Sequence, residues 1–169
     1  MTYSLLREPL LLADTCHKSP RNMKEDLLHL RPQATQKPSR TTSAYWLFAE
    51  RLTGTYPGAT EKCGKWLIFV PAKNIDFVWE RIRKATEDGR LGDSSKVATA
   101  KANPIAAESS MKVICVYTYD WKDEEDVKRI RTELRTLGII WKIPYKSDED
   151  TEAGKYRATG HTRISKYYE

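Results

Sequence analysis

Residues 74–89, NIDFVWERIRKATEDG, contain the clearest structural signal in the chain. The apolar residues Ile75, Val78, Trp79 and Ile82 recur at intervals of three and four, which places them on one face of a helix. The stretch opens with an asparagine that suits an N-cap and closes with a glycine that suits a helix stop. We therefore predict an amphipathic helix whose tryptophan belongs to the core.

A second stretch, residues 123–138, DEEDVKRIRTELRTLG, repeats this design. Val127, Ile130 and Leu134 form its apolar stripe. Its acidic residues lie in the first turn and its basic residues follow, which is the order that the helix dipole favours. A second amphipathic helix is predicted.

Apolar blocks separated by turn residues are typical of β-strands. The chain has five such blocks, at residues 44–49, 65–70, 96–100, 112–119 and 139–145. Each predicted helix is followed by a strand. The simplest architecture is α+β, with a curved, mostly antiparallel sheet and both helices packed on one of its faces.

The first 42 residues differ from the rest, because four prolines interrupt them at short intervals and no long apolar block lies between. A short helix is predicted at residues 22–30 and a linker at 33–42. We therefore divide the chain into a basic, mostly irregular N-terminal arm, residues 1–42, and a single α+β domain, residues 43–169.

The composition limits the possible classes of protein. Lys and Arg outnumber Asp and Glu by 29 to 23, a net charge of +6. This charge is compatible with a polyanion partner and equally with ordinary surface solvation. No apolar run approaches the roughly 20 residues that span a bilayer, so no membrane association is predicted.

The three cysteines, Cys16, Cys63 and Cys115, are scattered, and no pair has the short spacing of a metal site or redox motif. They indicate a reducing compartment, which is the cytoplasm, with the nucleus as the alternative. Cys115 is predicted to be a core residue, whereas Cys63 precedes a glycine in a loop and is expected to be accessible. No metal is predicted, and neither a P-loop nor a dinucleotide fingerprint is found, so no cofactor is predicted.

Cations mixed with aromatic rings mark the C-terminal residues 145–169. Lys146, Lys155, Arg157 and His161 alternate there with four tyrosines, a mixture that suits phosphate contacts and base stacking. The alternative is a solvated terminal segment. Two further lysines, at positions 96 and 101, flank the third predicted strand, and solvated strand ends are again the alternative.

The other tryptophans are assigned by their position. Trp46, Trp66 and Trp141 lie within predicted strands, so we expect them in the core. Trp121 lies between two charged residues in a loop, and we expect it to be exposed.

Several segments together resemble the basophilic leukaemia expressed protein family, over roughly residues 43–168. They are GKWLIF at 64–69, GRLG at 89–92 leading to SKVAT at 95–99, VICVYT at 113–118, and YKSD at 145–148 with Thr151 and GKY at 154–156. That family looks like a relative of the eukaryotic messenger-RNA cap-binding initiation factors. The resemblance implies their fold, a curved antiparallel sheet backed by helices.

The same resemblance bears on function. Cap-binding factors have a Gly-Arg-Trp-Leu-Ile segment, and Lys65 stands where its arginine does, while their phosphate-contacting arginine falls near Lys101. Those factors sandwich the methylated base between two tryptophans on loops that precede this segment. The only tryptophan before Gly64 here is Trp46, in a predicted strand. The sandwich is therefore missing from this sequence.

Our first hypothesis is a noncatalytic module that binds RNA, a nucleotide or another phosphorylated ligand on the concave side of the sheet. Its candidate residues are Lys65, Lys96, Lys101, Lys146, Lys155, Arg157 and His161. One alternative is an enzyme for a phosphorylated or other anionic substrate, with His161 or a lysine as general acid or base and the loop at 89–95 as a support. Another is a protein-interaction module that uses the N-terminal arm and the exposed helix faces.

Overall fold

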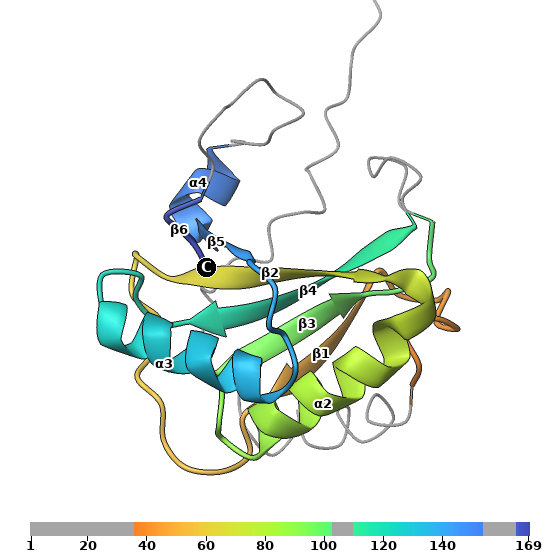
Figure 1. The fold of residues 1–169 in the computed structure, drawn as a ribbon, viewed down its shortest axis with the longest axis horizontal. Coiled ribbons are helices and arrows are strands. Elements are labelled where there is room, and N and C mark those ends of the chain that lie inside the picture. The colour runs from red at the N-terminus through yellow and green to blue at the C-terminus, as the bar shows by residue number, and fades with distance from the viewer. Residues whose placement is uncertain (1–35, 103–109, 154–164) are drawn as a thin grey trace, which may run out of the picture.

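The computed structural model describes residues 36–102, 110–153 and 165–169 (Figure 1). Its elements, in chain order, are β1 (Trp46–Glu50), β2 (Gly64–Pro71), the 3-10 helix η2 (Ala72–Asn74), α2 (Ile75–Glu87), β3 (Ser94–Ala98), β4 (Met111–Thr118), α3 (Glu124–Thr136), β5 (Pro144–Ser147), α4 (Asp148–Glu152) and β6 (Tyr167–Tyr168). The predicted helix at 22–30 lies outside the described residues.

All strands belong to one sheet with the order β1-β3-β4-β2-β5-β6, and every neighbouring pair is antiparallel. Figure 1 shows α2 and α3 side by side on one face of this curved sheet. The predicted α+β architecture is confirmed. No helix of the described segments is long and apolar enough to cross a membrane.

The core lies between the sheet and the two long helices. Alternate residues of each strand point to it, so that Trp66 and Ile68 of β2 are buried beside Ile114 and Val116 of β4. The Trp66 indole Nε1 donates a hydrogen bond to the Val127 carbonyl of α3, 3.3 Å away. Each such large side chain contributes about 1.5–3 kcal/mol through burial.

The ends of both long helices follow the sequence signals. The Asp123 carboxylate caps α3 by accepting a hydrogen bond from the Asp126 backbone N–H, 3.1 Å away. Asn74 occupies the cap position of α2, although its side chain forms no capping hydrogen bond. Gly89 follows α2 with φ +76°, a conformation that favours glycine.

The predicted strand at 139–145 is wrong, because β5 begins only at Pro144. The carbonyl groups of this segment are used elsewhere: the buried Arg131 guanidinium of α3 donates to Ile139 O at 2.8 Å and to Trp141 O at 2.7 Å. It also donates to Glu169 O at 3.2 Å. An arginine of an amphipathic helix thus fixes the loop that sequence periodicity presents as a strand.

The structure also corrects four side-chain predictions. Trp141 is 42% exposed, since its segment is not a strand, and Trp46 is half-buried on the face away from α2 and α3. Trp121 is not fully exposed, because it packs partly against the core. Cys63 is only 1% exposed, and its thiol lies 3.4 Å from Asp148 Oδ2.

The third strand also differs from the prediction. It spans Ser94–Ala98 instead of residues 96–100. Its last paired residue, Ala98, lies opposite Trp46 of β1. Lys101 therefore lies beyond the end of the strand.

Residues 37–41 form a turn that contacts the domain. The Ser39 backbone N–H and hydroxyl group both donate to the Asp76 carboxylate of α2, at 2.9 and 2.6 Å. The Ala100 N–H donates to Pro38 O at 2.9 Å. Hydrogen bonds thus cross residue 42, where we proposed the domain boundary.

Candidate functional site

The predicted site residues of the strands lie on the sheet face opposite α2 and α3. Strand alternation explains this placement, because the neighbours of these residues point to the helices. For example, the Ser95 and Thr86 hydroxyl groups share a hydrogen bond of 2.9 Å, which turns Ser95 toward α2 and Lys96 away from it. We define the lysine face by its central side chains, which are Trp46, Lys65, Lys96, Tyr117 and Lys146.

Tyr117 lies between two of these lysines. Its ring centroid is 5.4 Å from the Lys65 Nζ and 5.7 Å from the Lys96 Nζ. The Lys96 Nζ is also 4.5 Å from the centroid of the Trp46 ring. Ring faces attract cations at these distances, so two aromatic side chains help to hold the ammonium groups in place.

The third lysine adds a further positive charge. Lys146 lies directly opposite Lys65 in the ladder between β5 and β2. The Asp148 carboxylate, at the start of α4, is 2.6 Å from the Lys65 Nζ. Burial, together with the charge of Lys65, lowers the pKa of Lys146 to about 8. Three lysines thus share this face, and the Asp148 carboxylate offsets the charge of one of them.

All three lysines are buried, with exposed fractions of 6% for Lys65, 4% for Lys96 and 4% for Lys146. The lysines predicted for the concave side of the sheet are therefore largely covered by other parts of the protein. An anion that reaches these ammonium groups has to replace contacts that they already make. In return, such an anion would interact with fixed charges in a medium of low dielectric, where electrostatic attraction is strong.

The remaining predicted residues are placed differently. Lys101 lies beyond β3, where its Nζ is 4.2 Å from the centroid of the Tyr45 ring and donates to Ser43 O at 3.2 Å. Lys155, Arg157 and His161 lie outside the described residues. Of the predicted set, the structure thus brings together Lys65, Lys96 and Lys146.

The predicted set of site residues did not include three members of this arrangement, namely Trp46, Tyr117 and Asp148. Strand alternation places Tyr117 and Cys115 of β4 on one face, and this signal was available. The strand register could not be predicted from the sequence, because the ladder that pairs Lys65 with Tyr117 joins segments far apart in the chain. Asp148 reads in the sequence as one of several acidic residues that follow a strand.

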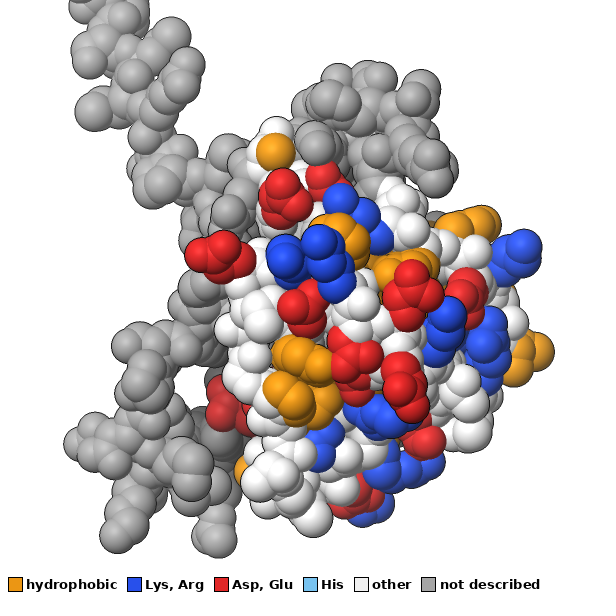
Figure 2. Space-filling view, turned by 90° about the vertical axis from the view of Figure 1, so that its left-hand side faces the viewer, with side chains coloured by type: hydrophobic (Ala, Val, Ile, Leu, Met, Phe, Trp, Pro, Cys, Tyr) orange, Lys and Arg blue, Asp and Glu red, His pale blue; other side chains and the backbone are white. Residues whose placement is uncertain are grey.

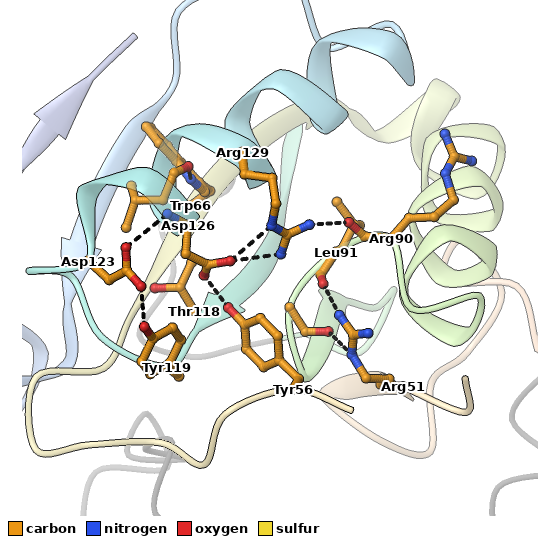
Figure 3. A network of polar contacts seen from close by, with 12 residues as sticks. Arg51, Tyr56, Trp66, Arg90, Leu91, Thr118, Tyr119, Asp123, Asp126 and Arg129 are labelled. Atoms are coloured by element: carbon orange, nitrogen blue, oxygen red, sulfur yellow. Dashed lines mark hydrogen bonds and ion pairs between the residues drawn. The ribbon is translucent and has the colours of Figure 1, made fainter. Parts of the chain in front are cut away.

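A network of polar contacts holds the loop between β1 and β2, just before Lys65. Figure 3 shows the Tyr56 hydroxyl group donating to the Asp126 carboxylate, which also accepts hydrogen bonds from Arg129 at 2.8 and 3.0 Å. The Arg51 guanidinium donates to the carbonyl groups of Leu91 and Gly92. The loop is thereby tied to α3 and to the turn before β3.

The surface on the side where α3 begins carries both signs of charge. Figure 2 shows Lys and Arg side chains interspersed there with Asp and Glu. Ion pairs account for part of this pattern, such as Lys128 with Glu124 at 2.9 Å. This side is therefore a poor candidate for a polyanion site, in contrast to the lysine face.

The fold is similar to that of solved eIF4E structures. A schistosome eIF4E complexed with m7GpppA and 4E-BP matches with a TM-score of 0.59 and 19% identity, covering 86% of this chain and 80% of that chain. C. elegans eIF4E-3 with the 4E-binding protein Mextli and a cap analog matches with a TM-score of 0.54 and 16% identity, and the coverage of both chains is the same. Ascaris suum eIF4E-3 with the m2,2,7G cap matches with a TM-score of 0.52 and 19% identity, covering 85% of this chain and 79% of that chain. The cap-binding-factor-like fold is thus confirmed.

The sequence match identifies a family. It extends from residue 58, in the loop before β2, to residue 153, just after α4. Lys65, Lys96, Tyr117 and Lys146 all fall within it. Because the match covers more than half of the chain, this protein belongs to the family described as basophilic leukemia-expressed protein Bles03.

Proposed function

We propose that this protein is a noncatalytic module that binds a phosphorylated ligand, a nucleotide or a short RNA, at the lysine face. The observation that carries the proposal is that Lys65 and Lys96 flank the Tyr117 ring and that Lys146 lies directly opposite Lys65. Three ammonium groups next to aromatic rings suit an anionic ligand that also has a ring to stack. The solved neighbours with this fold bind m7GpppA and other caps, which supports the same ligand class.

The proposal does not extend to the base recognition of those neighbours. Trp46 is the only tryptophan on the lysine face as defined here, and it already lies beneath the Lys96 ammonium group. Charge is therefore the main source of affinity in this proposal. We accordingly expect weak discrimination between m7GTP and GTP and a strong dependence on salt concentration, because counterions are released when phosphates bind.

The test is a titration of the full chain with m7GpppA, GTP and a ten-nucleotide RNA at low and high salt, followed by thermal shift and tryptophan fluorescence. A ligand that binds the folded state alone raises the melting temperature. Lys96→Met removes a charge and keeps the length of the side chain, so it should weaken binding by about tenfold, as expected for a lost charged contact. Lys128→Met, an exposed lysine of α3, is the matched control.

The outcomes separate the hypotheses. Binding that Lys96→Met weakens and Lys128→Met preserves would support the proposed site. A flat response to all three ligands at low salt would exclude it. Recovery of a chemically altered ligand after incubation, detected by mass spectrometry, would favour the alternative of an enzyme.

A further inference from the structure

A cleft of about 960 Å³ lies against β2 and α2, where β2 extends past its pairing with β5. Figure 1 shows the chain between α3 and β5 passing in front of the sheet, and this segment forms one wall of the cleft. The side chains that matter here are Phe69 of β2, Phe77 and Arg81 of α2, and Trp141 and Lys142 of the wall.

The cleft contains an open strand edge. β5 pairs with β2 only at Gly64, Lys65 and Trp66, whereas β2 continues to Pro71. Within the described segments, no strand pairs with residues 67–71 on that side. An open edge presents backbone N–H and C=O groups to which another extended chain can pair.

The same cleft gathers most of the exposed apolar surface. Seven large hydrophobic side chains of the described residues are exposed, and five of them line the cleft: Phe69, Phe77, Met111, Trp141 and Tyr168. Phe77 is 67% exposed and Trp141 42%. Apolar side chains gathered at one place mark binding surfaces, whereas isolated ones need no explanation.

The charge of the cleft has one sign. Its lining includes Arg81, Lys142 and Lys146 and no aspartate or glutamate of the described residues. The nearest acidic side chains of α2 are engaged elsewhere, because Asp76 accepts from Ser39 and Glu80 pairs with Arg83 at 2.6 Å. An occupant with acidic groups is therefore favoured.

We propose that this cleft binds an extended segment of a partner protein, apolar at its centre and acidic at its ends, which adds to the sheet along residues 67–71. Residues 67–71 span about 17 Å at the rise of an antiparallel strand, and Pro71 offers only its carbonyl group because proline has no N–H. Backbone pairing supplies affinity, and the apolar pocket between Phe77 and Trp141 supplies specificity. The proposal goes beyond phosphorylated-ligand binding, and the two sites share only Lys146.

The probe is a fluorescein-labelled peptide, Glu-Ile-Thr-Val-Thr-Val-Glu, titrated against the full chain by fluorescence polarisation. We expect saturable binding that Trp141→Ala weakens by about tenfold, as for the loss of an aromatic anchor. Arg81→Glu should weaken binding of this peptide and improve binding of a version with lysine at both ends. Lys84→Glu, on the same helix but outside the cleft, should leave both affinities unchanged within about twofold.

Two N-methylated peptides test the strand pairing itself. Successive N–H groups of a strand point to opposite sides, so methylation of one alternate set should abolish binding while methylation of the other set is tolerated. Equal effects of the two sets would overturn the proposal, as would failure of the unmodified peptide to bind. Dimerisation of the chain through this edge, detected by light scattering and abolished by Phe69→Asp, would also overturn it. None of these variants removes a lysine-face residue, so this test is independent of the nucleotide titration.

Discussion

Lys65 lies directly opposite Lys146 in the ladder between β2 and β5. The negative charge of Asp148 acts on both buried ammonium groups. Like charges placed directly opposite each other destabilise a sheet. The arrangement persists because the Asp148 carboxylate lies 2.6 Å from the Lys65 Nζ. Asp148 thus offsets the charge of Lys65, and the charges of Asp150 and Asp148 both favour the charged form of Lys146.

Replacement of that carboxylate should be strongly destabilising. Asp148→Asn leaves Lys65 buried without its ion-pair partner, and such a change costs about 3–5 kcal/mol of unfolding free energy. Urea denaturation measures the effect. Asp88→Asn is the control, because Asp88 pairs with Lys84 at the surface, where such pairs contribute about 0–1 kcal/mol.

A double variant tests whether the unpaired charge of Lys65 causes this destabilisation. Lys65→Met combined with Asp148→Asn removes both charges, and it should be more stable than Asp148→Asn alone. A double variant that is less stable than the single one would show that the carboxylate acts through contacts other than the ion pair.

The lowered pKa of Lys146 predicts a pH effect with a definite sign. Its pKa falls from 10.5 to about 8 on folding, so between these values the unfolded chain binds a proton that the folded chain has lost. Stability contributed by this group therefore rises with pH through this window and is lowest below pH 8. The unfolding free energy of the wild type should rise relative to Lys146→Met between about pH 7.5 and pH 10, in denaturation series at matched pH.

The comparison with Lys146→Met is needed because other groups titrate in the same range. Burial raises the pKa of Tyr145 and of Cys115, so both lower the stability as alkaline pH is approached. Their contributions are common to both proteins and cancel in the difference. A difference that stays constant with pH would contradict the prediction.

The buried guanidinium of Arg131 should matter more than its helix neighbours. Arg131→Met leaves the carbonyl groups of Ile139 and Trp141 without their donor, at about 1–3 kcal/mol for each buried group. Arg135→Met removes a surface contact with Glu169 of 3.4 Å and should cost less than about 1 kcal/mol. Thermal denaturation of both variants checks the contrast.

Hydrogen exchange would localise the Arg131 effect. The amides of residues 139–143 should exchange faster in Arg131→Met, whereas those of β3 should keep their protection. Uniformly faster exchange would mean that Arg131 supports the whole core and not this loop in particular.

Gly92 should tolerate no side chain. A Cβ atom at this position would lie 1.8 Å from the Tyr117 carbonyl oxygen, which is backbone and cannot move aside. Gly92→Ala is therefore expected to cost at least about 1–3 kcal/mol, the usual penalty of overpacking. At Gly58 a Cβ atom meets nothing within 4 Å, so Gly58→Ala is the control. Equal melting temperatures of the two variants would contradict the close approach of the Tyr117 carbonyl group to Gly92.

The spacing of apolar residues predicts the helices and strands that bury one regular apolar face. Both long helices and the strands β1, β2 and β4 were found close to their predicted bounds, because a period of 3.6 or 2 residues is itself the signature of one buried face. At residues 139–143 the apolar pattern does not form a strand, and only Ile139 and Ile143 are buried. There the carbonyl groups bind Arg131, a partner that local sequence cannot reveal.

The sequence by itself determined which residues alternate toward the core and which carry charge, because alternation and charge are local properties of the chain. Tertiary structure alone decided that Lys65 and Lys96 flank Tyr117, that Lys146 lies opposite Lys65, and that Trp141 lines a cleft. Such neighbours depend on strand order and register, which are fixed by the burial of all strands and helices together.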